Sequence, residues 1–417
     1  MSKVIFLGYL FQGHINPTLG LVNELVNRGE EVIYYSGKEF CKKIEATGAK
    51  FRDYGFIQDP SESNKTQKVQ GNLDAFAQVV TWVLNVGKQI ISNISSEIEA
   101  DRPDYIIHDS QAFWGKRIAG SLGIPAVSSI ASFALTGKML DIDPDFFIEN
   151  MLRMPNASLF AKKKSNIVRL LDLLSRRISA AYDEPDFNIY DFANNTGKLN
   201  IVYTSEYFQP YGEVFDDSFK FVGHSIFKRT ENVDFPFDKL GSLPLIYIAL
   251  GTVRTNRLDF YRECFSAFGD MEIQVVLSVG TNVDVYQLGK IPDNFIVRNY
   301  VPQLEILKYA SVFITHGGTN SVNEGLYNNV PLIVYPQGDD NHIVAGRVEN
   351  LGAGIYLKND DINAEELKNA ISRVLSDENF KINSKAIGDT LKTAGGYLRA
   401  VDEIFKFKGE LDYENMV

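Results

Sequence analysis

The chain has few of the residues that build metal sites, disulfide frameworks and nucleic-acid surfaces. Two cysteines, Cys41 and Cys264, stand far apart in its 417 residues. This spacing fits no zinc motif, so we expect unpaired thiols in a reducing cytoplasm and no resident metal. The formal net charge is −11 at pH 7, without a long basic block. That charge argues against a nucleic acid as a partner.

Long hydrophobic runs are also missing. No apolar segment approaches the roughly 18–20 residues of a membrane span. The start, MSKVIFLGYL, lacks the cleavage-like small residues of a signal peptide. We therefore expect a cytoplasmic protein that does not insert into a membrane. Because single domains run to roughly 50–250 residues, we also expect two domains.

Neither of the usual phosphate-binding fingerprints occurs in the first glycine-flanked loop. GYLFQGHI, residues 8–15, has the glycine spacing of a P-loop but His-Ile where Lys-Ser/Thr belongs, and it lacks G-x-G-x-x-G. An apolar strand is predicted over 4–8, and Asn16 is suited to cap a helix that starts at Pro17. With a further strand over 31–35, this pattern predicts a βαβ unit of a parallel sheet.

Two polar residues come at the ends of predicted strands in the first half. His14 follows the first strand, and Asp109 ends a strand that starts at Tyr105. Because parallel strands share one carboxyl edge, where open α/β folds bind ligands, we expect both side chains there. A carboxylate bound to one imidazole nitrogen leaves the other as a general base. Alternatively, His14 caps backbone in its loop and Asp109 caps the helix predicted over 111–122. We expect His108, which points inward along its strand, to be structural.

The second half carries the most specific stretch, YVPQLEILKYASVFITHGGTNSVNEGLYNNVPLIVYPQGDDN, over 300–341. It predicts a strand over 312–315, a tight turn at 316–318 and a helix over 319–328. Such a turn presents backbone N–H groups and the positive end of the helix dipole to a ligand. We therefore predict an anion site built without lysine, and a nucleotide diphosphate is our working hypothesis for its ligand.

A change of composition separates two βα-series. Residues 211–243 carry prolines, glycines and mixed charges with little periodicity, which is typical of an interdomain linker. The predicted domains are 1–210 and 244–390, and residues 391–417 form a helix that returns to the first domain. The segment 132–200 is either a cover over the acceptor site or a helical insertion with a solvated lysine face. The predicted fold class is α/β, with two Rossmann-like domains.

Together, these motifs resemble the UDP-glycosyltransferase superfamily, specifically its bacterial macrolide glycosyltransferase-like branch. The resemblance rests on FLGYLFQGHINPTLGLVNEL, YIALGT, VPQLEIL and HGGTNSVNEGLYNNVPLIVYPQ, and it covers nearly the whole chain. It implies a GT-B fold, in which two Rossmann-like domains face each other across a cleft. It also implies an inverting, metal-independent transfer of a hexose from a UDP-sugar to a small acceptor. No cofactor is implied, because the nucleotide sugar is a co-substrate.

The resemblance assigns roles to individual residues. His14 matches the general base of the family and Asp109 its partner. Many relatives have an acidic residue and glutamine as the sugar-binding pair, so Asp340-Asn341 leaves the sugar open, with glucose as the first guess. The residues that match donor-binding positions are Tyr300 and Val301 near the base, Gln303 and Glu324 at the ribose, His316, Gly318, Asn320, Ser321 and Thr252 at the diphosphate, and Asp340 and Asn341 at the sugar.

The acceptor is expected to be flat and hydrophobic, such as a flavonoid or a macrolide. We predict Phe113, Trp114, Phe133 and Phe147 as acceptor-binding residues. One alternative is a UDP-sugar epimerase of the same fold. Another is a non-catalytic protein that binds the nucleotide sugar or the acceptor, which does not need the His14–Asp109 pair. We expect a monomer or a weak dimer whose partners are these two small molecules.

Overall fold

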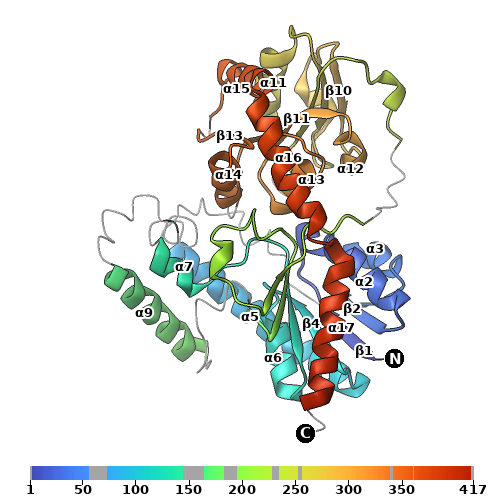
Figure 1. The fold of residues 1–417 in the computed structure, drawn as a ribbon, viewed down its shortest axis with the longest axis vertical. Helices are drawn as coiled ribbons and strands as arrows, with labels where there is room; N and C mark the ends of the chain where they lie inside the picture. Colours follow the sequence, from blue (N-terminus) through green and yellow to red (C-terminus); the bar gives the residue numbers. More distant parts are fainter. Residues whose placement is uncertain are drawn as a thin grey trace. The chain divides into compact units, whose positions relative to one another are not determined.

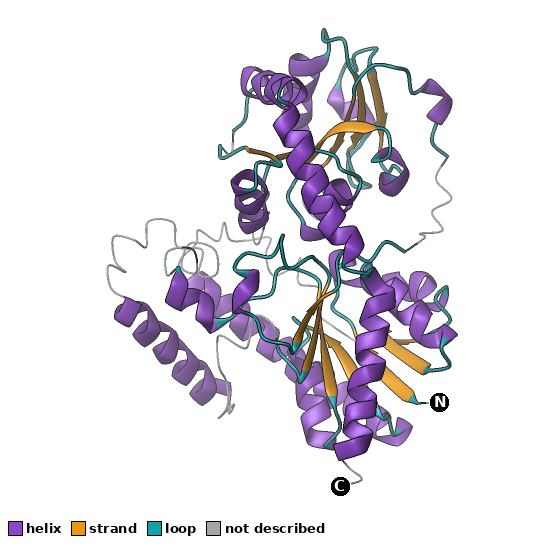
Figure 2. Cartoon of the chain, in the orientation of Figure 1, coloured by secondary structure: helices purple, strands orange, loops and turns teal. Residues whose placement is uncertain are grey.

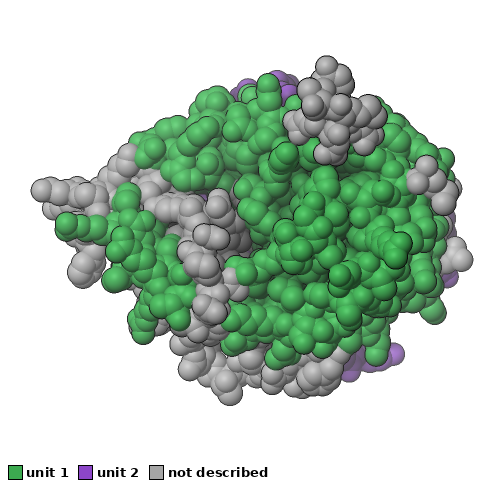
Figure 3. Space-filling view, turned by 90° about the horizontal axis from the view of Figure 1, so that it is seen from below, with its two compact units in different colours: residues 1–227, 395–417 green, residues 228–394 purple. Residues whose placement is uncertain are grey.

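The computed structural model describes residues 2–55, 73–143, 146, 164–182, 195–227, 234–251, 256–338, 341–359 and 361–414. The chain divides into two compact units, coloured separately in Figure 3. Unit 1 comprises Met1–Phe227 and Gly395–Val417, and unit 2 comprises Lys228–Ala394. Each unit is built around one parallel β-sheet with helices packed on it (Figures 1 and 2). This arrangement confirms the predicted α/β class with two Rossmann-like domains.

Unit 1 contains a seven-stranded sheet in the order β3-β2-β1-β4-β5-β6-β7. Its strands are β1 (Lys3–Leu7), β2 (Glu31–Ser36), β3 (Lys50–Asp53), β4 (Tyr105–Asp109), β5 (Ala126–Ile130), β6 (Leu199–Val202) and β7 (Phe219–Phe221). Its helices are α1 (Gln12–Ile15), α2 (Thr18–Asn27), α3 (Cys41–Glu45), α5 (Leu73–Asp101), α6 (Phe113–Leu122), α7 (Gly137–Ile142), α9 (Lys164–Tyr182) and α17 (Gly396–Glu414), with 3₁₀ turns η1 (Lys38–Phe40) and η4 (Gly212–Val214).

The central strand of unit 1 shows why its sequence is a continuous apolar run. Ile5 and Leu7 pack into one core cluster, and Val4 and Phe6 pack into another. A parallel strand with helices over both faces must be apolar on both. Burying one such side chain contributes about 1.5–3 kcal/mol. The same run ends at the sheet edge where the next loop begins, so the core strand also positions that loop.

The last helix, α17, belongs to unit 1. Ala400, Val401 and Ile404 pack into the cluster that also holds Val4 and Phe6. Lys408 Nζ lies 2.7 Å from the carboxylate of the buried Glu30. Helix α17 is therefore held on the sheet of unit 1 by both apolar packing and a partly buried ion pair.

Unit 2 contains a six-stranded sheet in the order β10-β9-β8-β11-β12-β13. Its strands are β8 (Leu245–Ala249), β9 (Gln274–Ser278), β10 (Phe295–Arg298), β11 (Ala310–Thr315), β12 (Leu332–Val334) and β13 (Gly354–Tyr356). Its helices are α11 (Leu258–Phe268), α12 (Gln303–Ile306), α13 (Thr319–Tyr327), α14 (Asn341–Asn350), α15 (Ala364–Ser376) and α16 (Glu378–Thr393), with 3₁₀ turns η5 (Phe237–Lys239) and η6 (Val285–Leu288).

The structure corrects two local predictions. Asn16 does not cap a helix that starts at Pro17: the short helix α1 comes first, α2 begins at Thr18, and no side chain caps α2. Residues 211–243, predicted as a linker, include β7, which pairs with β6. Phe221 of β7 packs against Ile130 and Val202. Sheet pairing and burial therefore keep the first part of that segment within unit 1.

Candidate active site

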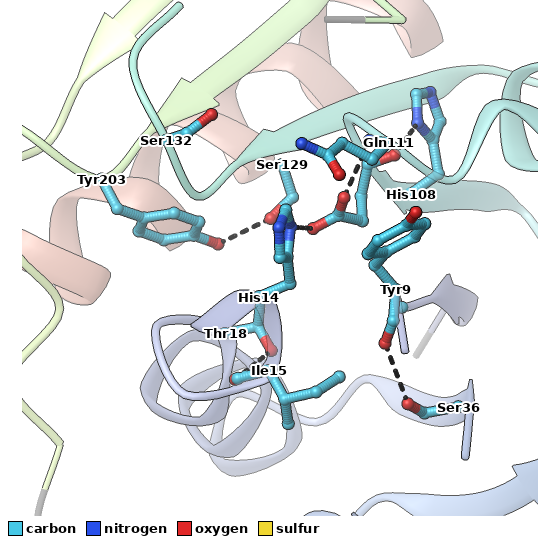
Figure 4. A network of polar contacts seen from close by, with 12 residues as sticks. Tyr9, His14, Ile15, Thr18, Ser36, His108, Gln111, Ser129, Ser132 and Tyr203 are labelled. Carbon is cyan, nitrogen blue, oxygen red and sulfur yellow. Dashed lines mark hydrogen bonds and ion pairs between the residues drawn. The ribbon is translucent and has the colours of Figure 1, made fainter. Parts of the chain in front are cut away.

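The first half of the candidate site is a hydrogen-bonded histidine and aspartate in unit 1. His14 lies on α1, just after β1, and Asp109 ends the neighbouring strand β4. His14 Nδ1 and Asp109 Oδ2 are 2.8 Å apart, as the dashed contact at His14 in Figure 4 shows. The carboxylate side chain is 1% exposed and the imidazole 16%. The sequence prediction that both side chains meet at one sheet edge therefore agrees with the geometry.

The second carboxylate oxygen of Asp109 is also used. Oδ1 accepts a hydrogen bond from the Gln111 backbone N–H at 2.8 Å. Helix α6 begins only at Phe113, with Ala112 as its N-cap and no side-chain cap, so the alternative of Asp109 as the helix cap is wrong. Hydrogen bonds to both oxygens hold the carboxylate in place, and the carboxylate in turn orients the imidazole. With Nδ1 donating to Asp109, Nε2 is the ring nitrogen that can accept a proton.

His108 next to this pair is a core residue, as predicted. Its side chain is fully buried, and Nδ1 lies 3.1 Å from the carbonyl oxygen of Asp109. Burial lowers the pKa of His108 to about 4. His108 is therefore neutral near pH 7, and its hydrogen bond holds the backbone at the end of β4.

Buried aromatic rings surround the histidine–aspartate pair. Tyr9 is 5.1 Å from the His14 ring centroid, and Trp114 stacks on Tyr9 at 6.1 Å. Burial, and to a smaller extent the Asp109 carboxylate, raises the pKa of the Tyr9 hydroxyl. Tyr9 is therefore a neutral phenol at physiological pH. Tyr9 therefore adds no charge next to the Asp109 carboxylate.

The predicted acceptor-binding aromatics lie in the core. Phe113, Trp114 and Phe133 are 7%, 1% and 4% exposed, and Trp114 Nε1 donates to the Tyr54 hydroxyl at 3.2 Å. Rings so covered offer little surface to a ligand in this conformation, because they fill the space between helices and sheet. Phe147 lies outside the described residues. Phe113, Trp114 and Phe133 are therefore core residues in this conformation, and their role as acceptor-binding residues stays a prediction.

Phe11 is an aromatic residue that sequence reasoning missed. It is 39% exposed, and its backbone carbonyl accepts the His14 N–H at 2.9 Å. Its ring lies 5.4 Å from Tyr9. The signal was its place three residues before His14 in the loop motif. An exposed ring in the same loop as the histidine can contact a hydrophobic acceptor.

The second half of the candidate site is the turn between β11 and α13 in unit 2. Gly317 has a φ of +90°, which only glycine adopts readily. A Cβ atom there would also lie 3.0 Å from the carbonyl oxygen of Asn341, the first residue of α14. No side chain caps α13, whose N-cap is Gly318. The first-turn N–H groups of α13 can therefore bind an anion.

His316 is held between two glycines at this turn. A Cβ atom at Gly251 would lie 2.7 Å from the His316 ring, and one at Gly318 would lie 2.5 Å from it. Within the described part of the chain, the buried Nδ1 atom has no hydrogen-bond partner. Burial lowers the pKa of His316 to about 4. The ring is therefore a neutral imidazole near pH 7, able to donate one hydrogen bond to an oxygen ligand.

Four polar side chains form a network behind the turn. The Tyr247 hydroxyl donates to Gln303 Oε1 at 3.0 Å. Gln303 Nε2 donates to Glu324 Oε2 at 2.6 Å and lies 3.4 Å from Ser321 Oγ. Glu324 is 1% exposed. These hydrogen bonds hold the Glu324 carboxylate in one orientation within unit 2.

The remaining predicted donor residues vary in exposure. Tyr300 is 36% exposed and Val301 is 2% exposed, so Tyr300 offers a ring surface whereas Val301 offers backbone at most. Asn320 and Asn341 are both half-buried, at the starts of α13 and α14. Thr252 and Asp340 lie outside the described residues. The structure therefore brings the described donor residues to the same edge of the unit 2 sheet.

Neither a candidate metal site nor a membrane-spanning helix occurs in the described ranges. Within those ranges, no group of three or more His, Cys, Asp or Glu side chains could hold a metal ion. Cys41 and Cys264 are free thiols, as predicted. Among the helices that the structure describes, none combines the length and hydropathy needed to cross a bilayer.

Comparisons with known proteins point to one group of enzymes. The family model described as "Erythromycin biosynthesis protein CIII-like, C-terminal domain" matches residues 262–394. The chain is 37% identical over 408 residues to an uncharacterized UDP-glucosyltransferase, YojK, of Bacillus subtilis (strain 168), and the match covers 97% of each protein. It is 29% identical over 400 residues to the oleandomycin glycosyltransferase of Streptomyces antibioticus, covering 94% of this chain and 87% of that one. The solved structure of the calicheamicin glycosyltransferase CalG4 is similar with a TM-score of 0.79 at 24% identity, over 98% of each chain.

Proposed function

The chain belongs to the UDP-glycosyltransferase superfamily, in its macrolide glycosyltransferase-like branch, and on that premise we propose that it moves a hexose from a UDP-sugar to a hydroxyl group of a small hydrophobic acceptor. It is a glycosyltransferase with the GT-B fold. The observation that carries the finer proposal is the 2.8 Å hydrogen bond between His14 and Asp109. A protein that only bound a nucleotide sugar would not need this pair.

In the proposed reaction, His14 is the general base. An alcohol is a poor nucleophile near pH 7, so its proton must leave as it attacks. Nε2 takes that proton, and Asp109 stabilises the imidazolium that forms. The acceptor oxygen bonds to the anomeric carbon while the bond from that carbon to the diphosphate oxygen breaks. The electron pair leaves with UDP, and in-line attack inverts the anomeric configuration.

The turn before α13 is proposed to hold the leaving diphosphate. Backbone N–H groups at Gly318, Asn320 and Ser321 and the helix dipole favour the negative charge that develops there. His316 adds a hydrogen bond from a neutral ring, because burial disfavours its charged form. These groups support a transfer in which no metal is needed. Thr252 and Asp340 remain predicted contributors outside the described residues.

The donor and acceptor are proposed from different observations. Gln303 and Glu324, which match ribose-binding positions and are hydrogen-bonded to each other, support a ribonucleotide. The name of the YojK relative, a UDP-glucosyltransferase, supports UDP-glucose as the first donor to test. Asn341 is one methylene shorter than the glutamine of many relatives, so its reach to the sugar differs. The oleandomycin glycosyltransferase is named for a macrolide, which supports a hydrophobic acceptor, as does the exposed Phe11 ring.

A donor and acceptor screen tests this proposal. UDP-, TDP- and GDP-sugars are incubated with a panel of phenolic and macrolide acceptors, and products are separated by mass spectrometry. We expect UDP release in equal amount to glycoside formed, with a β-glycoside from an α-linked donor by NMR. Conversion of the UDP-sugar to its epimer would replace the proposal with an epimerase. UDP-sugar binding without turnover for any acceptor would replace it with a binding protein.

A further inference from the structure

Tyr247 lies in the middle of β8 and is not among the predicted site residues. It is 1% exposed, and its ring stacks on Phe313 at 4.8 Å with an interplanar angle of 16°. This packing holds the phenol ring in one orientation, which fixes the direction of its hydroxyl group. The hydroxyl lies 3.0 Å from the amide oxygen of Gln303.

The orientation of the Gln303 amide follows from its other neighbour. One end of the amide is 2.6 Å from Glu324 Oε2. An amide oxygen so close to a carboxylate oxygen would repel it, so this end must be the NH₂ group. The oxygen end then faces the Tyr247 hydroxyl, which donates to it. The contacts at both ends of the amide therefore require the same orientation, and Tyr247 stabilises that orientation against a flip.

We infer that Tyr247 is a positioning residue that acts through Gln303 on Glu324 and thereby sets the preference for a ribose over a 2′-deoxyribose in the donor nucleotide. This inference rests on the proposed function, in which Glu324 receives the ribose hydroxyls. A carboxylate can accept from the 2′- and 3′-hydroxyls together only if its plane is fixed. The Gln303 N–H bond fixes that plane, and the Tyr247 hydroxyl keeps the N–H in place.

Nucleotide binding without turnover tests the inference. UDP and 2′-deoxy-UDP are titrated into the full-length protein by calorimetry, for the wild type and Tyr247→Phe. We expect the wild type to prefer UDP by about tenfold or more, since a hydrogen bond to a charged group is lost with the 2′-hydroxyl. Tyr247→Phe should reduce the preference to about threefold or less, by weakening UDP rather than 2′-deoxy-UDP.

Tyr261→Phe is the matched control. Its hydroxyl is buried in the same unit and donates to the Val279 carbonyl at 3.5 Å, away from Gln303. This variant should keep the wild-type preference. Equal far-ultraviolet circular dichroism of both variants shows that unit 2 is folded. An unchanged preference in Tyr247→Phe, or an equal loss of affinity for both nucleotides, overturns the inference.

A double-mutant cycle separates positioning from general packing. In a Gln303→Ala background, Tyr247→Phe should change the preference no further, because Tyr247 acts through the amide. Additive effects would mean that Tyr247 acts by another route and would overturn the inference. A protein that glycosylates an acceptor from UDP-glucose yet shows an unchanged preference in Tyr247→Phe keeps the proposed function and loses only this inference. A protein that shows the expected nucleotide preferences without any transfer keeps this inference and loses the proposed function.

Discussion

Two histidines follow central strands of the two sheets, and their surroundings are opposite. His14 follows β1 and bonds a buried carboxylate at 2.8 Å. His316 follows β11, lies between Gly251 and Gly318, and has a buried Nδ1 without a hydrogen-bond partner in the described ranges. A neighbouring carboxylate favours an imidazolium, whereas burial without a charge partner disfavours it. The two histidines are therefore proposed for two different roles.

The contrast matches the two ends of a glycosyl transfer. In the proposed reaction the acceptor end needs a group that gains and loses a proton in each cycle, and Asp109 is proposed to stabilise its protonated form. The diphosphate end needs hydrogen-bond donors that keep one protonation state. A pKa of about 4 keeps His316 neutral throughout the physiological range. Substitutions at His14 and at His316 should therefore show their effects in different measurements.

Removing the base should have the largest effect. His14→Ala is expected to lower kcat by about 10³-fold or more, because general-base catalysis contributes roughly 10²–10⁴-fold. UDP affinity, measured by calorimetry, should stay within about twofold, since the donor residues lie in the other unit. Full transfer activity in this variant would remove His14 from the base role and with it the contrast with His316.

Removing the charge that supports the base should have the next largest effect. Asp109→Asn keeps the shape of the side chain but cannot stabilise an imidazolium, so we expect kcat to fall about 10²-fold. Asp101→Asn is the control, because it loses an ion pair with Arg52 elsewhere in unit 1. Steady-state kinetics of both variants measure kcat and test this prediction. An equal loss in the control would assign the effect to stability.

Substitutions in the donor network should act on binding instead. Glu324→Ala and Ser321→Ala are expected to raise the donor KM about 10- to 100-fold and about 3- to 10-fold, because each removes a hydrogen-bonding group. Glu365→Ala, an exposed carboxylate on α15, should leave KM unchanged. If both donor variants kept the wild-type KM, neither residue would belong to the pocket.

The smallest effect should be a pH dependence of stability that His316 contributes. Its pKa is about 4 when folded and about 6.5 when unfolded. Between these values the unfolded chain binds the proton and the folded chain does not. Stability is therefore fully present above about pH 6.5 and falls as the pH drops toward 4. Between pH 7 and pH 5 the loss should be on the order of 2 kcal/mol.

His316→Asn isolates that contribution. Urea unfolding of unit 2, followed at both pH values, should show a smaller loss in the variant than in the wild type. His108 has a similarly lowered pKa in unit 1 and stays in place in both proteins, so it serves as an internal reference. An identical pH dependence in the two proteins would contradict the low pKa of His316.

Many of the strands were predictable from local patterns. Apolar runs that end in a glycine or a polar residue marked β1, β4 and β11, because a parallel strand buried on both faces must be apolar throughout. Several elements escaped this reasoning, among them α1 and β7, which are too short to show a period, and the longer helix α16. Short elements depend on their neighbours, since they bury too little surface to form alone.

The residue types at the sheet edges were determined by the sequence itself. His14, Asp109 and the turn at His316 follow strands, and chain connectivity alone brings the ends of parallel strands to one edge. The tertiary structure alone decided which side chains those edges cover. It buried Phe113, Trp114 and Phe133 and left Phe11 exposed. It also aimed Tyr247 at Gln303 and lowered the pKa of His316. Burial and hydrogen-bond direction depend on residues far apart in the chain, so no local pattern contains them.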